Sequence, residues 1–182
     1  CFVPLGSTAS KQARTAAVNV CGGDDEFPGV MATTVCEVFD YTVARSGLTE
    51  GEAEEAGRAC VSAVTPVLDR AHFMPSAALV VIKLVADADS GRLIGVQVVG
   101  PGEAAKRCDV AVAAMHGGLS VDQIANLDLC YAPPYSQALD SLHTACNVLR
   151  NKMAGHLATV KAHELRQMLA RSEADDLHRR RE

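Results

Sequence analysis

The order of strand-like and helix-like segments is the feature that most constrains the fold of this chain. Strand patterns rich in apolar and β-branched residues occupy the stretch from 33 to 99, at 35–43, 60–68, 77–85 and 93–99. Helical periodicity dominates after residue 100, at 103–116, 137–153 and 162–170. Strands that precede helices in this way predict an α+β fold, in which helices flank an antiparallel β-sheet.

Turn and capping residues delimit several of these segments. The acidic, glycine-containing stretch 87–91 predicts a hairpin between two of the strands. Thr49 with Glu52 forms a capping-box pattern at the start of a short acidic helix, whose carboxylates, Glu50 among them, are interpreted as a solvated face. Ser120 with Gln123 repeats the capping pattern before the last strongly periodic helix.

A further helix is predicted ahead of the strands, at residues 8–21. Its apolar face consists almost entirely of alanine, so we expect it to pack closely against a large neighbour. Ser7 or Thr8 is the expected N-cap, and Gly22-Gly23 is the expected stop. The small-residue loop before it is either an ordinary cap or a helix N-terminus that offers N–H groups to an anionic ligand atom.

Composition and charge exclude several functional classes. Hydrophobic residues make up 48% of the 182 positions, enough for a substantial core, and the net charge of −5 argues against a nucleic-acid partner or an anionic membrane surface. No apolar run is long enough to span a bilayer or to resemble a signal peptide. We therefore predict a cytoplasmic protein with neither a nucleic-acid nor a membrane partner.

The cysteines and histidines predict neither a metal site nor a disulfide framework. The seven cysteines are odd in number and widely spaced, with no CxxC, and no two histidines have the i, i+4 spacing of a helical metal site. The cysteines are expected to be small buried residues in a reducing compartment. The residues contain no Gly-x-Gly-x-x-Gly, Walker or Gly-x-Ser-x-Gly pattern and hence no complete active site.

Tyr131 stands beside a stiff Pro133-Pro134 pair, with Tyr135 directly after it. Each proline biases the preceding residue toward an extended conformation, so the segment holds its aromatic rings in fixed directions. From the residues alone, Tyr131 is either a packing residue that pins a turn or a functional hydroxyl.

Residues 30–151 resemble the C-terminal dimerisation domain of the FAD-dependent pyridine nucleotide–disulfide oxidoreductases. Within that family they are most similar to the subgroup of coenzyme A-disulfide reductases, NADH oxidases and NADH peroxidases. The matching pieces agree in order and spacing, and they lie at 39–50, 73–77, 83–85, 95–100, 127–136 and Asp140.

The resemblance implies a division of the chain into three parts. Residues 1–29 would be the C-terminal end of an FAD-binding domain, and residues 30–155 the dimerisation domain of a homodimer. Residues 156–182 would be a helical tail or the start of a fused rhodanese-like domain, because 163–166 is reminiscent of the opening helix of such a domain. A first residue other than Met and a charged end add to the expectation that the chain is a piece of a longer protein.

The resemblance also assigns candidate site residues. The first helix would face the pyrimidine end of FAD, with Leu5, Gly6, Ser7, Thr8 and Ala9 as the cofactor-binding residues. Arg14 would meet the phosphates of coenzyme A. Tyr131 would contact the substrate and act as the catalytic hydrogen-bond donor in the partner's active site. Phe73 would also line the substrate site, where coenzyme A-disulfide reductases tend to have a tyrosine.

The activity implied for the parent protein is that of a flavoprotein oxidoreductase. NAD(P)H would reduce FAD, FAD a cysteine, and that cysteine a small disulfide such as coenzyme A disulfide. The alternatives are an NADH oxidase or peroxidase acting on oxygen species, and a purely structural dimerisation module. The dinucleotide fingerprints and the redox cysteine are missing from the sequence, so we expect the chain alone to be inactive and to bind no FAD tightly.

Overall fold

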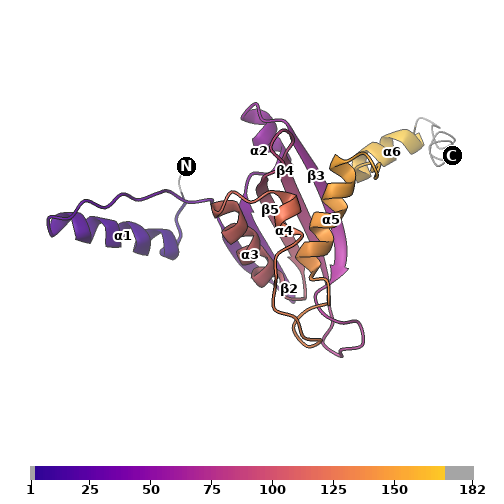
Figure 1. Cartoon of the computed structure of the whole chain (residues 1–182), viewed down its shortest axis with the longest axis horizontal. Helices are drawn as coiled ribbons and strands as arrows, with labels where there is room; N and C mark the ends of the chain where they lie inside the picture. The colour runs from indigo at the N-terminus through magenta and orange to yellow at the C-terminus, as the bar shows by residue number, and fades with distance from the viewer. Residues whose placement is uncertain (1–2, 171–182) are drawn as a thin grey trace.

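The computed structural model describes residues 3–170, which form one five-stranded antiparallel β-sheet with helices against it (Figure 1). The strand order across the sheet is β1-β2-β5-β4-β3. The strands are β1 (Thr34–Val38), β2 (Tyr41–Gly47), β3 (Cys60–Leu68), β4 (Leu79–Asp87) and β5 (Leu93–Gly100). This arrangement confirms the predicted α+β fold.

The longer helices of the C-terminal half cover one face of the sheet and leave most of the other open. α3 (Ala104–His116) packs on β2 and β5, while α5 (Ser141–Met153) packs on β3 and β4, with α4 (Val121–Ile124) beside α5 (Figure 1). Alternate strand residues point toward these helices and form a single core. Its most fully buried members include Val80, Ile82, Leu84, Val96, Val98, Ala111, Leu142 and Leu149.

The open face carries an apolar strip. Val99 of β5 lies between Val43 of β2 and Val81 of β4 in the strand register. Val43 and Val99 are 37% and 38% exposed, and Val64 on β3 is 57% exposed. Within a single chain this strip is not covered by any of the described helices that build the core.

The segment predicted as one strand at 35–43 is a hairpin of two strands. β1 and β2 pair antiparallel from Val38↔Tyr41 outward, so Phe39 and Asp40 form a two-residue loop. Phe39 has a positive φ of 53°, the conformation that such tight hairpins require at a central position. The prediction was wrong because this loop lacks the glycine or asparagine that normally marks such a turn.

Two helix starts also differ from their predictions. α1 (Gly6–Val20) has Leu5 as its N-cap without a side-chain hydrogen bond, so neither Ser7 nor Thr8 caps it. α5 begins at Ser141 instead of residue 137, because the Asp140 carboxylate accepts a hydrogen bond from the Leu142 amide at 2.9 Å and ends the preceding loop.

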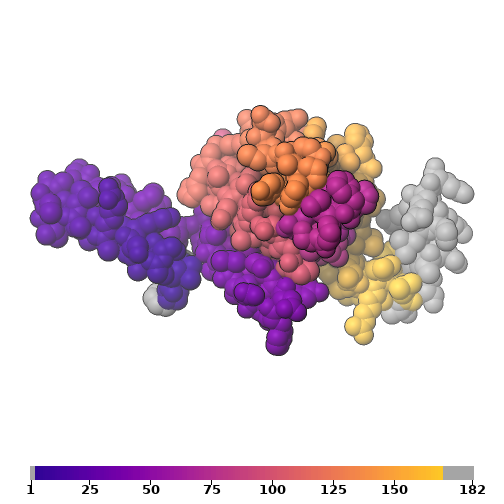
Figure 2. All heavy atoms as spheres, turned by 90° about the horizontal axis from the view of Figure 1, so that it is seen from below, coloured from indigo at the N-terminus to yellow at the C-terminus, as the bar shows by residue number. Residues whose placement is uncertain are grey.

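α1 projects from the body of the protein in both overall views (Figures 1 and 2). Thr8 is its one buried residue, and the alanine face predicted to pack against a large neighbour is exposed. The two remaining helices are α2 (Glu50–Glu55) and α6 (Ala162–Ala170). The rest of the predicted tail, residues 171–182, lies outside the described range.

The described cysteines differ in burial, two being buried, three exposed and Cys60 half-buried, which the prediction of general burial did not anticipate. Cys108 and Cys146 are buried in the core, where burial raises the pKa of their thiols to about 11 and about 12. Cys21, Cys36 and Cys130 are exposed, and the described cysteines are free thiols. Within residues 3–170, no group of three or more His, Cys, Asp or Glu side chains could hold a metal ion.

Among the described helices, none is both long and apolar enough to cross a membrane.

Candidate functional site

Two loops at one end of the sheet carry two of the three predicted substrate-binding residues. The loop between β3 and β4 carries Phe73, and the segment between α4 and α5 carries Tyr131; they lie side by side below the sheet (Figure 1). A direct bond joins them, since Nη1 of Arg70 donates to the Pro134 carbonyl at 3.1 Å. The fold thus brings together two regions that are distant in the sequence.

Tyr131 lies on the surface of a tightly turned segment. The carbonyl of Ala132 accepts hydrogen bonds from the amides of Tyr135, at 2.8 Å, and Ser136, at 3.1 Å. The buried Ser136 hydroxyl donates to the Cys130 carbonyl at 3.3 Å. The Tyr131 side of this turn faces outward, because the residue is 54% exposed and does not enter the core of the chain.

Phe73 is also exposed, at 65%, and its ring contacts His72 edge to face with centroids 5.6 Å apart. The loop beneath it is held by the carboxylate of Asp69, which is fully buried. Burial raises the pKa of Asp69, but hydrogen bonds from Arg70 and from the amides of Ala78 and Glu103 outweigh it and lower the pKa. The loop therefore rests on a charged carboxylate with its hydrogen bonds satisfied.

The predicted cofactor-binding residues form the first turn of α1. No side chain caps this end, and no acidic residue neutralises the positive end of the helix dipole. A Cβ atom added at Gly6 would meet nothing within 4 Å, so the approach is open. The uncapped, open start of α1 could accept one electron-rich edge of the FAD flavin ring. The phosphates of FAD would have to be bound by residues that this chain does not contain.

Arg14 is exposed on α1 and does not meet the Tyr131 loop within one chain, since α1 stands outside the body of the protein (Figures 1 and 2). The structure therefore groups the predicted site residues into two sets. Tyr131 and Phe73 share one end of the sheet, while residues 5–9 and Arg14 share the projecting helix.

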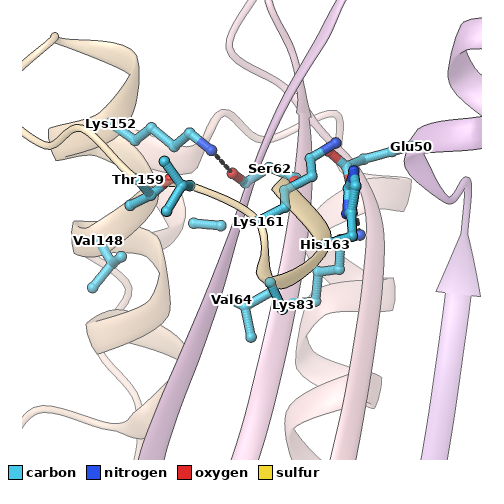
Figure 3. Close-up of a pocket in the computed structure, with 12 residues that line it drawn as sticks. Glu50, Ser62, Val64, Lys83, Val148, Lys152, Thr159, Lys161 and His163 are labelled. Atoms are coloured by element: carbon cyan, nitrogen blue, oxygen red, sulfur yellow. Dashed lines mark hydrogen bonds and ion pairs between the residues drawn. The ribbon is translucent and has the colours of Figure 1, made fainter. Parts of the chain in front are cut away.

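A separate hollow lies elsewhere, between β3, β4, the end of α5 and residues 159–163 (Figure 3). It measures about 630 Å³ and is not lined by Tyr131, Phe73 or Arg14. Glu50 projects into it and forms ion pairs with Lys83 and, at 3.2 Å, with Lys161.

Glu50 is therefore not part of a solvated helix face, as the acidic pattern had suggested. Partial burial raises its pKa, but hydrogen bonds from Lys83, Ser62 and Lys161 prevail and lower the pKa to about 2. These bonds tie the segment before α6 to the sheet. The sequence did not predict these ion pairs because Glu50, Lys83 and Lys161 lie far apart along the chain.

A comparison with known families identifies the domain. The profile described as "Pyridine nucleotide-disulphide oxidoreductase, dimerisation domain" matches residues 33–143, more than half of the chain. The chain belongs to the pyridine nucleotide-disulphide oxidoreductase family. This result confirms the resemblance drawn from the sequence. The exact domain limits of 30 and 155 stay a prediction.

Two solved structures superpose well on this chain. A NAD-dependent persulfide reductase from A. fulgidus is 44% identical with a TM-score of 0.87, over 89% of this chain and 30% of that one. The reduced CoADR-RHD of Bacillus anthracis is 32% identical, also with a TM-score of 0.87, over 94% of this chain and 31% of that one.

A curated relative is similar over most of the chain. The NAD(P)H sulfur oxidoreductase (CoA-dependent) of Pyrococcus furiosus is 33% identical over 149 residues, which are 82% of this chain and 34% of that protein. The chain spans about a third of the length of the curated relatives it matches.

Proposed function

We propose that this chain is the dimerisation and active-site-completing part of a homodimeric flavoprotein that reduces a small sulfur–sulfur substrate such as coenzyme A disulfide. The observation that carries the proposal is an outward-facing Tyr131 on a loop that the dimerisation domain holds in place. The names of the relatives support a sulfur substrate, since they include a coenzyme A disulfide reductase and a coenzyme A polysulfide/persulfide reductase.

The chemical role of Tyr131 follows from the charge that develops when a sulfur–sulfur bond breaks. FAD, when bound by the parent protein, would pass the electrons of NAD(P)H to a redox cysteine outside this chain. As that thiolate attacks the substrate, one sulfur forms a mixed disulfide and the other leaves as a thiolate. The hydroxyl of Tyr131 donates a hydrogen bond to the sulfur that carries the charge.

The positions of the two sets of predicted site residues suggest that a site is shared between two subunits. Arg14 and the first turn of α1 are separated from Tyr131 within one chain, so we propose that Tyr131 completes the site of the other subunit. Residues 5–9 would face the pyrimidine edge of the flavin, and Arg14 would bind the phosphates of coenzyme A. Phe73 has no hydroxyl and would contact the substrate through its ring alone. Tyr131 would then supply the hydrogen-bond donor on this side of the substrate site.

An NADH oxidase is the second candidate function. The observation in its favour is a relative from Methanocaldococcus jannaschii named NADH oxidase, which is 29% identical over 83% of this chain. Steady-state turnover of coenzyme A disulfide against oxygen separates the two functions. A faster reaction with oxygen at saturating NAD(P)H would favour the oxidase.

Replacing Tyr131 with phenylalanine in the full-length reductase tests the main proposal. The ring remains and the donor is lost, so turnover of the disulfide should fall by about 10²-fold while the dimer persists. Tyr41→Phe is the matched control, because Tyr41 is similarly exposed at 53% but lies on the β1–β2 hairpin. Parental turnover in Tyr131→Phe would refute a catalytic role and favour the structural module.

A further inference from the structure

Arg107 is the largest fully buried side chain of the described protein, with 1% of its surface exposed. It extends from α3 to the base of both loops. Its Nη2 atom donates to the backbone carbonyl of Asp69, where the Phe73 loop begins, and to that of Tyr135, at 3.4 Å, in the Tyr131 loop. The same guanidinium bonds the Asp140 carboxylate at 3.1 Å and the Ser141 hydroxyl at 2.9 Å.

Arg70 makes a second connection between the same two loops. Its Nη2 and Nε atoms donate to the Asp69 carboxylate at 2.8 and 3.1 Å, and its Nη1 atom donates to the Pro134 carbonyl at 3.1 Å and the Ser76 hydroxyl at 3.2 Å. The planar guanidinium of Arg70 thus binds a carboxylate of the Phe73 loop and a backbone carbonyl of the Tyr131 loop.

Each arginine of this cluster pairs with a buried carboxylate, and Arg70 also lies 3.8 Å from the exposed carboxylate of Glu103. Arg70 and Arg107 face the carboxylates of Asp69 and Asp140, and both carboxylates are buried. A buried ion pair that merely held the core together would be replaceable by apolar side chains. Here both arginines also bind backbone carbonyls at two consecutive positions, those of Pro134, the second of the two prolines, and Tyr135. Their targets therefore point to control of loop geometry.

We propose that Arg70 and Arg107 are positioning residues, which lock the Phe73 loop and the Tyr131 loop into one unit and so fix the direction of the Tyr131 hydroxyl. The effect on catalysis rests on the function proposed above. The connection between the two loops, called here the mechanical link, does not. Lysine cannot replace either arginine in this role, because a single ammonium group lacks the planar fork that reaches two partners in fixed directions.

A spectroscopic experiment tests the mechanical link directly. The chain contains only three tyrosines, Tyr41, Tyr131 and Tyr135, so labelling with 3-fluorotyrosine gives three ¹⁹F signals. Arg70→Lys is the preferred variant, because the Arg70 side chain is 18% exposed and lysine keeps the charge opposite Asp69. We expect the Tyr131 and Tyr135 signals to shift or broaden, while the Tyr41 signal stays in place.

Arg58→Lys provides the matched control. Arg58 pairs with Asp87 at 2.9 Å on the surface and contacts neither loop in the described structure. It should leave the Tyr131 signal unchanged. An unchanged Tyr131 signal in Arg70→Lys would overturn the proposal, as would a shift of equal size in Arg58→Lys.

The activity of the full-length reductase provides the second test. A misdirected hydroxyl should lower kcat of Arg70→Lys by about 10-fold to 10²-fold, with the KM for NAD(P)H unchanged. If Arg70 acts through Tyr131, the double variant with Tyr131→Phe should be no slower than Tyr131→Phe alone. Fully additive losses would overturn the positioning role. A silent Tyr131→Phe would instead refute the proposed function, and the ¹⁹F experiment would still decide the mechanical link.

Discussion

Replacing Glu50 with glutamine should weaken the contact that holds residues 157–163 against the sheet. Glu50 begins α2, its side chain is 19% exposed, and it pairs with Lys83 of β4 and Lys161 ahead of α6. Glutamine keeps the volume but removes the charge, so both lysines lose their ionic partner.

The lowered pKa of Glu50 sets the size of the effect. A carboxyl whose pKa falls from 4.5 to about 2 on folding contributes at most about 3 kcal/mol to the free energy of unfolding. Water reaches the cluster, since Lys83 and Lys161 are 26% and 45% exposed, and screening reduces this figure. We expect Glu50→Gln to lower the free energy of unfolding by about 1–2 kcal/mol at pH 7.

The effect should depend on pH in a defined direction. The folded-state pKa of Glu50 lies below the unfolded one, so its contribution is complete above about pH 4.5 and is lost as the pH falls toward 2. Urea unfolding followed by circular dichroism at pH 7 and pH 3 should therefore show a smaller difference between parent and variant at pH 3. Glu55→Gln, an exposed change on the same helix, is the control. Equal losses in the two variants at pH 7, or a Glu50→Gln loss that persists in full at pH 3, would refute the reasoning.

Three further outcomes are expected. Leu149→Ala should cost about 2–5 kcal/mol in urea unfolding because Leu149 is fully buried, whereas Leu139→Ala, at an exposed position, should stay within about 0.5 kcal/mol of the parent. Alkylation of the native chain followed by mass spectrometry should modify the exposed Cys21, Cys36 and Cys130 well before the buried Cys108 and Cys146; early modification of the buried pair would contradict the described core. Sedimentation of the chain at tens of micromolar should show a homodimer, as expected of a dimerisation domain, and a monomer would count against it.

Segments with strong local patterns could be predicted from the sequence to the residue. β3 at 60–68 and α6 at 162–170 have the limits expected from their periodicity, and the capping boxes at Thr49 and Ser120 are formed. The helix and the capping boxes depend on neighbours within four residues, and the limits of β3 coincide with those of its apolar, β-branched run, so local sequence was enough to predict them. The turn at Phe39 was missed because its positive φ is imposed by the pairing of β1 with β2 instead of by a glycine.

The candidate site was only partly predictable, because some of its residues are brought together by tertiary contacts and not by local sequence. The Tyr131 segment could be found because its prolines and tyrosines are adjacent. Arg107 could not, since an arginine within a helix ordinarily faces solvent, and its partners Asp69 and Asp140 lie 38 and 33 residues away along the chain. Only the tertiary fold brings these charges together, so no local pattern signals their burial.

The strand order has a consequence for how the protein folds. β1 pairs with β2, and β3, β4 and β5 pair in succession, so each group can form from neighbouring segments. The groups meet only where β2 pairs with β5, for instance Gly47 with Gly95, about 50 residues apart along the chain. We expect closure of this seam, beneath α3, to limit the folding rate. In stopped-flow experiments, Val96→Ala within the seam should slow refolding more than Leu149→Ala does for an equal loss of stability.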